Sequence, residues 1–141
     1  ETHVGGIFGA SSGQSAEFCY NNGKIEGKQY VGGIGGMQGG TAKIINCYSV
    51  NEIIYGSSKP GGIVATNNTS TSLSIQNCYF SNTSTNNVIG TGNTNNIINC
   101  KSMTEEEMKS DDFIDLLNEN ANEDIWKKDI ENINNGYPIF K

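Results

Sequence analysis

The chain of 141 residues has no arginine, one histidine and one tryptophan, and only 35% of its residues are hydrophobic. No stretch approaches the roughly 18 consecutive apolar residues that a membrane-spanning helix needs. Without arginine the chain lacks bidentate phosphate recognition, and its net charge of −6 repels nucleic acid and anionic lipid. We therefore expect no nucleic-acid partner and no membrane span in this chain.

The same shortages argue against catalysis. His3 is the only histidine, so the sequence offers no convincing Cys–His or Ser–His pair. Residues 1–102 hold four widely spaced glutamates, so a carboxylate pair for glycoside cleavage would be fortuitous. We expect no catalytic residues, no enzymatic activity and no cofactor.

One polar segment partly matches the spacing of a calcium-binding loop. Its side-chain oxygens belong to Asn118, Asn120, Asn122, Asp124 and Asp129. Such a loop requires a glycine where this chain has Glu123, and no bidentate glutamate closes it. We interpret the segment as a polar linker and expect no metal site.

Glycine and asparagine are abundant instead, with 18 and 20 residues, and they recur in a pattern. Marks of the type Val-Gly-Gly-Ile or a relic of it start at residues 4, 31, 60 and 88, at intervals of 27, 29 and 28 residues. Each mark is followed by a cysteine: Cys19, Cys47, Cys78 and Cys100. Self-similarity at a period of roughly 20 to 50 residues is typical of stacked repeats.

The repeats predict an all-β fold. Short β-rich runs at 42–48, 73–80 and 96–100 are separated by clusters of turn-forming residues, and the glycine pairs suit tight bends or positive φ. Each period has room for three short strands, which would pair with the next period about 4.8 Å away. We predict a right-handed parallel β-helix (β-solenoid) over residues 1–102, with coils near 4–30, 31–59, 60–87 and 88–102. Since the chain starts directly before a complete repeat, we also expect upstream coils in a longer polypeptide.

Residues 103–141 differ in charge and pattern, with 11 acidic residues against 4 lysines. Thr104 and Glu107 have the spacing of a capping box, which predicts a short helix. Ser110 is placed to cap a second helix with one apolar face. The residues of that face are Phe113, Leu116 and Leu117.

The end of the chain should return to the repeats. We expect Trp126, Ile130 and Ile133 to lead back toward them, and a turn at 135–138 to precede a last strand at 139–140. The final coil of a solenoid exposes an unpaired edge, and natural proteins cover such edges. Residues 103–141 are therefore predicted to form a helical and extended C-terminal cap.

Taken together, these motifs resemble the GLUG repeat of bacterial surface proteins. The resemblance rests on Val-Gly-Gly-Ile, on Asn-Cys-Tyr and on a third element, which residues 22–27 supply in the first coil. The later coils depart from it: Pro60 replaces valine, residues 88–90 have lost the glycine pair, and Lys101 stands where tyrosine is expected. The tail, with Trp126 and residues 134–138, resembles the segment that closes such arrays.

The resemblance implies a β-solenoid on a cell surface. GLUG repeats occur in large secreted or wall-attached proteins, including putative adhesins and the non-catalytic regions of some IgA-specific metallopeptidases. The resemblance implies no enzymatic activity for the repeats.

The four cysteines occupy equivalent points of successive coils and should form an inward-facing column. An even count suggests disulfides, and neighbouring coils would restrict the pairing, for example to Cys19–Cys47 with Cys78–Cys100. In-register Cβ atoms lie about 4.8 Å apart, beyond the usual disulfide value of about 3.8 Å, so free stacked thiols are favoured. A zinc site is disfavoured because a linear stack lacks tetrahedral convergence.

The asparagines before three of the cysteines should form a second column. Asn46, Asn77 and Asn99 are expected to bond from coil to coil at a bend, with a glycan-binding role as the alternative.

The tyrosines after the cysteines should point away from the core. Tyr20, Tyr48 and Tyr79 are therefore candidates for an exposed aromatic platform for sugar rings or a partner protein. Alternatively, they pack against one another or beneath the acidic tail.

We therefore expect a structural and adhesive segment of a secreted or surface-anchored bacterial protein. Its extracellular outer face would be presented to host or matrix proteins or to glycans. Two alternatives stay open: a non-catalytic flanking domain of a larger secreted enzyme, such as a surface metallopeptidase, and a glycan-active β-helix enzyme.

Overall fold

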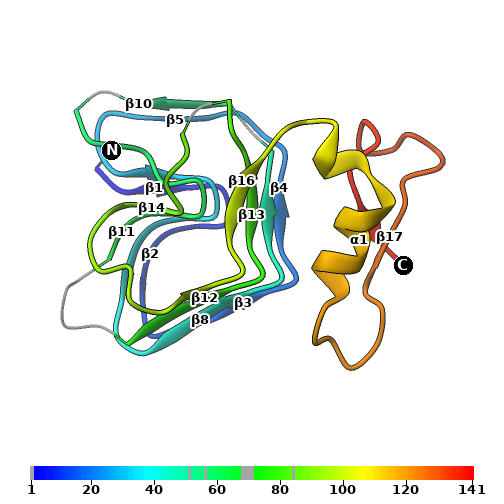
Figure 1. Cartoon of the computed structure of the whole chain (residues 1–141). Coiled ribbons are helices and arrows are strands. Elements are labelled where there is room, and N and C mark those ends of the chain that lie inside the picture. Colours follow the sequence, from blue (N-terminus) through cyan, green and yellow to red (C-terminus); the bar gives the residue numbers. More distant parts are fainter. Residues whose placement is uncertain (1, 51, 56, 68–71, 84) are drawn as a thin grey trace.

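The computed structural model describes residues 2–50, 52–55, 57–67, 72–83 and 85–141. Within these ranges the chain is mostly strand, with one α-helix and one short 3-10 helix, both after residue 103. The described strands before that point pair in parallel, and an antiparallel pair closes the C-terminal segment. The fold is therefore β-rich, as predicted, and is built from parallel sheets (Figure 1).

Three four-stranded parallel sheets each take one strand from every repeat. The first contains β2 (Phe8–Ser12), β7 (Gly35–Gly39), β11 (Val64–Asn67) and β14 (Ile89–Thr91). The second contains β3 (Ala16–Glu17), β8 (Ala42–Ile45), β12 (Leu73–Gln76) and β15 (Ile97–Ile98). The third contains β4 (Tyr20–Asn21), β9 (Tyr48–Ser49), β13 (Tyr79–Ser81) and β16 (Lys101–Met103). We call the strand sets β2–β4, β7–β9, β11–β13 and β14–β16 the four levels of the stack.

Two shorter parallel pairs continue this stacking. β1 (Val4–Gly5) pairs with β6 (Val31–Gly32), and β5 (Ile25–Gly27) pairs with β10 (Ile53–Tyr55). A bridge between Gly32 and Gly61 extends the first pair to the third repeat. The glycine marks of the first three repeats thus lie directly against one another.

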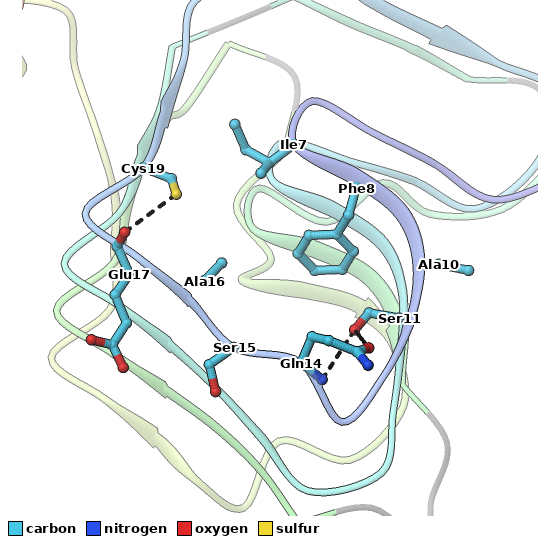
Figure 2. Close-up of a pocket in the computed structure, with 9 residues that line it drawn as sticks. All are labelled: Ile7, Phe8, Ala10, Ser11, Gln14, Ser15, Ala16, Glu17 and Cys19. Carbon is cyan, nitrogen blue, oxygen red and sulfur yellow. Dashed lines mark hydrogen bonds between the residues drawn. The ribbon is translucent and has the colours of Figure 1, made fainter.

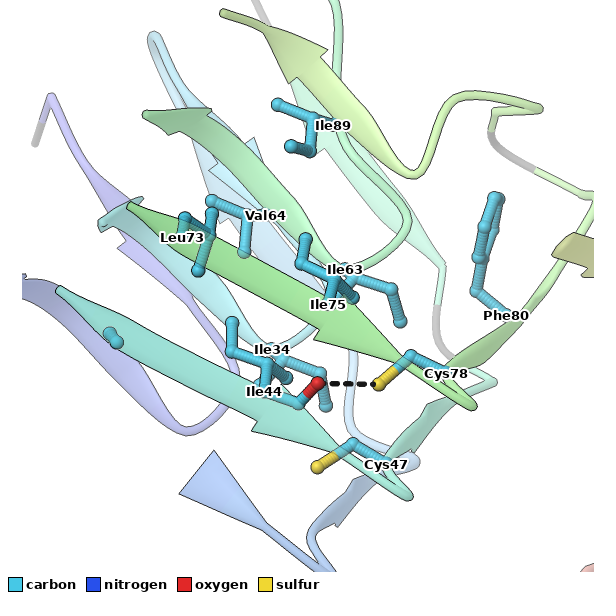
Figure 3. Packing of buried hydrophobic residues seen from close by; sticks show 11 residues of the cluster. Ile34, Ile44, Cys47, Ile63, Val64, Leu73, Ile75, Cys78, Phe80 and Ile89 are labelled. Atoms are coloured by element: carbon cyan, nitrogen blue, oxygen red, sulfur yellow. Dashed lines mark hydrogen bonds between the residues drawn. The ribbon is translucent and has the colours of Figure 1, made fainter. Parts of the chain in front are cut away.

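Side chains at equivalent positions meet inside the stack and form its core. Ala16, Ile44, Ile75 and Ile97 are Cα partners across the second sheet. In Figure 3 the side chains of successive levels follow one another in columns. The fully buried aliphatic side chains of this cluster include Ile34, Ile44, Ile63 and Ile75. A stack of this kind needs few apolar residues, because each level fills only a narrow interior.

The glycine pairs lie in crowded positions, against the backbone of their own repeat and against that of the neighbouring level. Gly61 is buried; its N–H donates to the Val31 carbonyl at 3.1 Å, and its carbonyl accepts the Gly33 N–H at 3.0 Å. A Cβ on Gly61 would overlap the carbonyl group of Val64. The described glycines with positive φ lie elsewhere, at Gly13, Gly40, Gly92 and Gly136. Of the two roles expected from the sequence, the pairs are therefore required at crowded bends where a Cβ would clash, and not for positive φ.

The asparagine before each of three cysteines bends the chain from the second sheet into the third. Asn46, Asn77 and Asn99 have φ of 53°, 48° and 52°, in the left-handed region that asparagine tolerates better than most residues. The runs at 42–48 and 73–80 are therefore each divided between two sheets. Phe18, with φ of 51°, makes the same bend in the first level.

The C-terminal segment forms the helices that its sequence predicted. A 3-10 turn, η1 (Glu107–Lys109), precedes α1 (Asp111–Asn118). Thr104 N–H donates to Glu107 Oε2 at 2.7 Å and Glu107 N–H donates to Thr104 Oγ1 at 3.2 Å, which is the capping box. Ser110 Oγ accepts the Phe113 N–H at 3.3 Å. Strands β17 (Trp126–Lys127) and β18 (Ile139–Phe140) follow as an antiparallel pair.

This segment lies along the side of the third sheet and not over the end of the stack (Figure 1). Its apolar residues share one cluster with residues of all four levels: Tyr20, Tyr48, Tyr79 and Met103. The expected cap over the last coil is thus corrected to a lateral cover. The physical reason is that the aromatic column of the third sheet offers a large apolar surface to bury.

Two isoleucines of the tail contradict their expected placement. Ile130 and Ile133 are 84% and 70% exposed, whereas Trp126 is 1% exposed and does pack on the stack. The helices described for this chain are too short and too polar to cross a membrane.

Candidate functional site

The third sheet carries the column of tyrosines expected from the sequence. Tyr20, Tyr48 and Tyr79 are Cα partners at successive levels, and Lys101 takes the same position in the fourth. The Tyr20 and Tyr48 rings are stacked with centroids 5.2 Å apart. All three rings belong to the second apolar cluster, outside the main core of the stack.

This tyrosine column is not an exposed platform. Tyr48 and Tyr79 are 0% and 2% exposed. Phe113 meets both rings edge-on, with centroid distances of 5.7 and 5.4 Å, and Trp126 lies 5.3 Å from Tyr48. Burial raises the pKa of Tyr79 to about 12 and also raises the pKa of Tyr48. The prediction of an outward binding platform at Tyr20, Tyr48 and Tyr79 is therefore wrong, because the acidic tail covers it.

A buried polar network fixes the tail to this column. The Tyr48 hydroxyl donates to the carbonyl of Pro138 and accepts from Asn134 Nδ2 at 2.8 Å. Asn134 Oδ1 accepts from Asn22 Nδ2, and Asn134 is 2% exposed. The sequence did not single out Asn22 or Asn134 as functional. The available signals were the predicted turn at 135–138 and the resemblance to the GLUG repeat at residues 22–27 and 134–138.

Asp129 holds the loop that carries Asn134. Its carboxylate accepts the backbone N–H groups of Ile133 at 2.8 Å, Asn134 at 2.7 Å and Gly136 at 3.0 Å. Burial opposes ionisation, but these three donors outweigh it and hold the pKa of Asp129 below its usual range. The carboxylate that partly matched a calcium loop is thus engaged by the backbone.

We expect Asp129→Asn to destabilise the fold and to flatten its response to acid. A depressed folded-state pKa stabilises the fold above the unfolded pKa of about 3.9, and this contribution is lost as pH falls through the folded-state value. Asparagine offers one acceptor oxygen to the three donors and does not titrate. Thermal midpoints between about pH 7 and pH 3 should fall more steeply in the wild type than in the variant. Parallel curves would contradict this role of Asp129.

The cysteine column faces the interior of the stack (Figure 3). All four thiols are free; Cys47 and Cys78 are buried, and the terminal members Cys19 and Cys100 are half-buried. The inner thiols donate to backbone carbonyls, Cys47 to Ile45 at 3.2 Å and Cys78 to Gln76 at 3.1 Å.

The asparagine column bonds from level to level. Asn77 Nδ2 donates to Asn46 Oδ1 at 3.1 Å, and Asn99 Nδ2 donates to Asn77 Oδ1 at 3.3 Å. Asn77 Nδ2 also donates to the Glu119 carbonyl at 3.2 Å, which ties the column to the end of α1. Asn46 and Asn77 are 2% and 4% exposed, so these two amides support the bend and are not open to a glycan, whereas Asn99 is exposed.

Hollows lie at both ends of the cysteine column. One of about 450 Å³ opens at the first level, where Ile7, Phe8, Ala16 and Cys19 line the interior (Figure 2). Another of about 350 Å³ lies between the fourth level and α1. Its lining residues are Tyr79, Asn99, Cys100, Lys101, Leu116 and Glu119. Among the described residues, no group of three or more His, Cys, Asp or Glu side chains is placed to hold a metal ion.

The outer side of the second sheet is not covered by the C-terminal segment (Figure 1). Lys43 is exposed and pairs in register with Ser74, while Gln76 pairs with the half-buried Ile45. Ile98, next in that row, is 51% exposed. We call this surface, made by Glu17, Lys43, Ile45, Ser74, Gln76 and Ile98, the second-sheet face.

No protein-family model, curated protein or solved structure matches this chain. The resemblance to the GLUG repeat therefore stays a prediction from the motifs.

Proposed function

We propose that this chain is a non-catalytic structural and adhesive segment of a secreted or surface-attached bacterial protein. Its repeats would form a right-handed parallel β-solenoid of about four coils. The in-register parallel stacking of three sheets over four levels carries this proposal. Such stacking creates regular outer faces, which suit extended recognition of a partner. The bacterial surface location rests on the resemblance to the GLUG repeat.

The second-sheet face is the surface on which we place ligand binding. The third sheet is occupied by the tail, which buries Tyr48 and Tyr79. The second-sheet face combines exposed charge at Lys43, an amide at Gln76 and an apolar side chain at Ile98. Spaced polar groups beside apolar area are the usual elements of a glycan or protein contact.

The test is binding of the intact chain to arrays of host and bacterial glycans and matrix proteins. For any ligand found, we expect the double variant Lys43→Ala, Gln76→Ala to weaken binding by about tenfold or more, as loss of well-placed contacts does. Lys28→Ala is the matched control, because Lys28 is also exposed but lies in the connection between β5 and β6. Its affinity should equal that of the wild type.

An equal loss of affinity in Lys28→Ala and in the double variant would contradict binding at the second-sheet face, because it would show a general effect of charge or a different binding surface. Failure to bind any array member would contradict the adhesive role. Release of new reducing ends from a bound glycan would overturn the non-catalytic role and favour the glycan-active alternative.

A further inference from the structure

The cysteine column is divided into two pairs by its backbone hydrogen bonds. The Cys19 N–H donates to Cys47 Sγ at 3.4 Å, and the Cys78 N–H donates to Cys100 Sγ at 3.4 Å. In each pair the sulfur of one cysteine accepts a hydrogen bond from the backbone N–H of the other. The acceptors are Cys47 and Cys100.

The two pairs differ in which member is accessible. In the first pair the acceptor Cys47 is fully buried, and the half-buried member is Cys19. In the second pair the acceptor Cys100 is itself half-buried and lines the 350 Å³ hollow beside α1. Its partner Cys78 is fully buried directly behind it. The second pair alone therefore combines an accepting sulfur, access from outside and an adjacent second thiol.

The electrostatics of the column point the same way. The neighbouring Cys78 side chain and the Cys78 N–H lower the pKa of Cys100, although burial opposes it. Hydrogen bonding lowers the pKa of Cys47 as well, but Cys47 is fully buried. Burial raises the pKa of Cys78, and the hydrogen bond to Cys47 raises the pKa of Cys19. Since the thiolate is the nucleophile, the half-buried Cys100 is better placed to attack than Cys19, whose pKa is raised, or Cys47, which is buried.

We infer that Cys100 and Cys78 form a thiol–disulfide exchange site, with Cys100 as the attacking sulfur and Cys78 as the resolving one. The site takes small organic disulfides, which enter through the hollow lined by Tyr79, Asn99, Lys101, Leu116 and Glu119. This inference is independent of the proposed adhesive role, which needs no thiol chemistry.

The exchange balances in two steps. The Cys100 thiolate attacks one sulfur of the small disulfide, which forms a mixed disulfide and releases the first small thiol. The Cys78 thiol then loses its proton and attacks the Cys100 sulfur, which expels the second small thiol. Overall, two protein thiols are oxidised to a Cys78–Cys100 disulfide, and the small disulfide is reduced to two thiols.

The stacking makes this disulfide possible but labile. Tyr79 and Lys101 are Cα partners, so the preceding residues Cys78 and Cys100 lie at matching points of neighbouring levels. Neighbouring parallel strands are about 4.8 Å apart, inside the Cα separation of about 4.4 to 6.8 Å that disulfides accept. The matching Cβ separation exceeds the usual range, so the bond strains the fourth level and is easily reduced again.

The experiment exposes the reduced, intact chain to glutathione disulfide, stops the reaction with acid and locates the modified cysteines by peptide mass mapping. We expect an early glutathione adduct on Cys100, followed by a Cys78–Cys100 link with a mass lower by two hydrogen atoms. Cys100→Ala should slow the total incorporation of glutathione into the folded chain by about tenfold or more. Cys19→Ala, the matched control at the other half-buried thiol, should react like the wild type.

The mapping on the wild type decides the question even if a variant folds poorly. A first adduct on Cys19 would overturn the inference. So would a Cys100 adduct that persists without forming the Cys78 link, or thiols that react only after denaturation.

Discussion

Gly61→Ala should cost about 3 kcal/mol or more of the unfolding free energy, at or above the upper end of overpacking effects. The added Cβ would overlap the Val64 carbonyl group and approach the Gly90 N, both backbone atoms that cannot rotate away. Both backbone groups of Gly61 are also bonded to the preceding repeat, the N–H to Val31 and the carbonyl to Gly33. Relief therefore requires moving the backbone of its own repeat at Val64 and that of the next repeat at Gly90. Urea unfolding followed by far-ultraviolet circular dichroism measures the loss.

Gly23→Ala is the matched control for this change. Gly23 is exposed, and its added Cβ would meet nothing closer than Asn21 Oδ1 at 3.4 Å. Its stability should stay within about 0.5 kcal/mol of the wild type. If Gly61→Ala were equally mild, the backbone crowding described around Gly61 would be contradicted.

The repeated part of this fold was readable from the sequence because equivalent residues must meet at every level. The Asn-Cys-Tyr spacing alone placed Cys78 in the interior of the stack, Tyr79 on the outer side of the third sheet and Asn77 at the bend. The described contacts agree at each position, although the tail buries Tyr79. Alternation along a strand and a fixed period determine such placements locally. Phe18 is the exception, since nothing in its identity predicts a positive φ; its place in the repeat was the only signal.

The course of the tail was not readable in the same way. The spacing of Phe113 and Leu117 shows that α1 has an apolar face, but it does not say which surface that face covers. That choice depends on contacts between distant residues, such as the bond from Asn134 to Tyr48 across 86 positions. Ile130 and Trp126 look alike as apolar residues in a polar segment, yet one is exposed and the other buried. Of the two readings of the tyrosine column, the exposed platform was wrong, and the alternative of packing beneath the acidic tail is the one that the structure has.

Phe113→Ala should destabilise the chain by about 3 to 5 kcal/mol, the range for removing a buried aromatic ring. Phe113 is 0% exposed and contacts the Tyr48 and Tyr79 rings edge-on, so its loss leaves a cavity between α1 and the third sheet. Ile130→Ala is the control, because Ile130 is 84% exposed and its truncation should change stability by less than about 0.5 kcal/mol. Equal effects of the two changes would contradict the lateral packing of the tail.

Urea unfolding of the wild type and of Phe113→Ala also shows whether the tail and the stack unfold together. Trp126, the single tryptophan, reports on the tail by fluorescence, while circular dichroism reports mainly on the sheets. Because Tyr20, Tyr48, Tyr79 and Met103 share one apolar cluster with the tail, the tail cannot leave without exposing side chains of every level. We therefore expect the two signals to change at the same urea concentration in the wild type and in Phe113→Ala. An earlier fluorescence transition would show that the tail detaches first and uncovers the tyrosine column while the sheets stay folded.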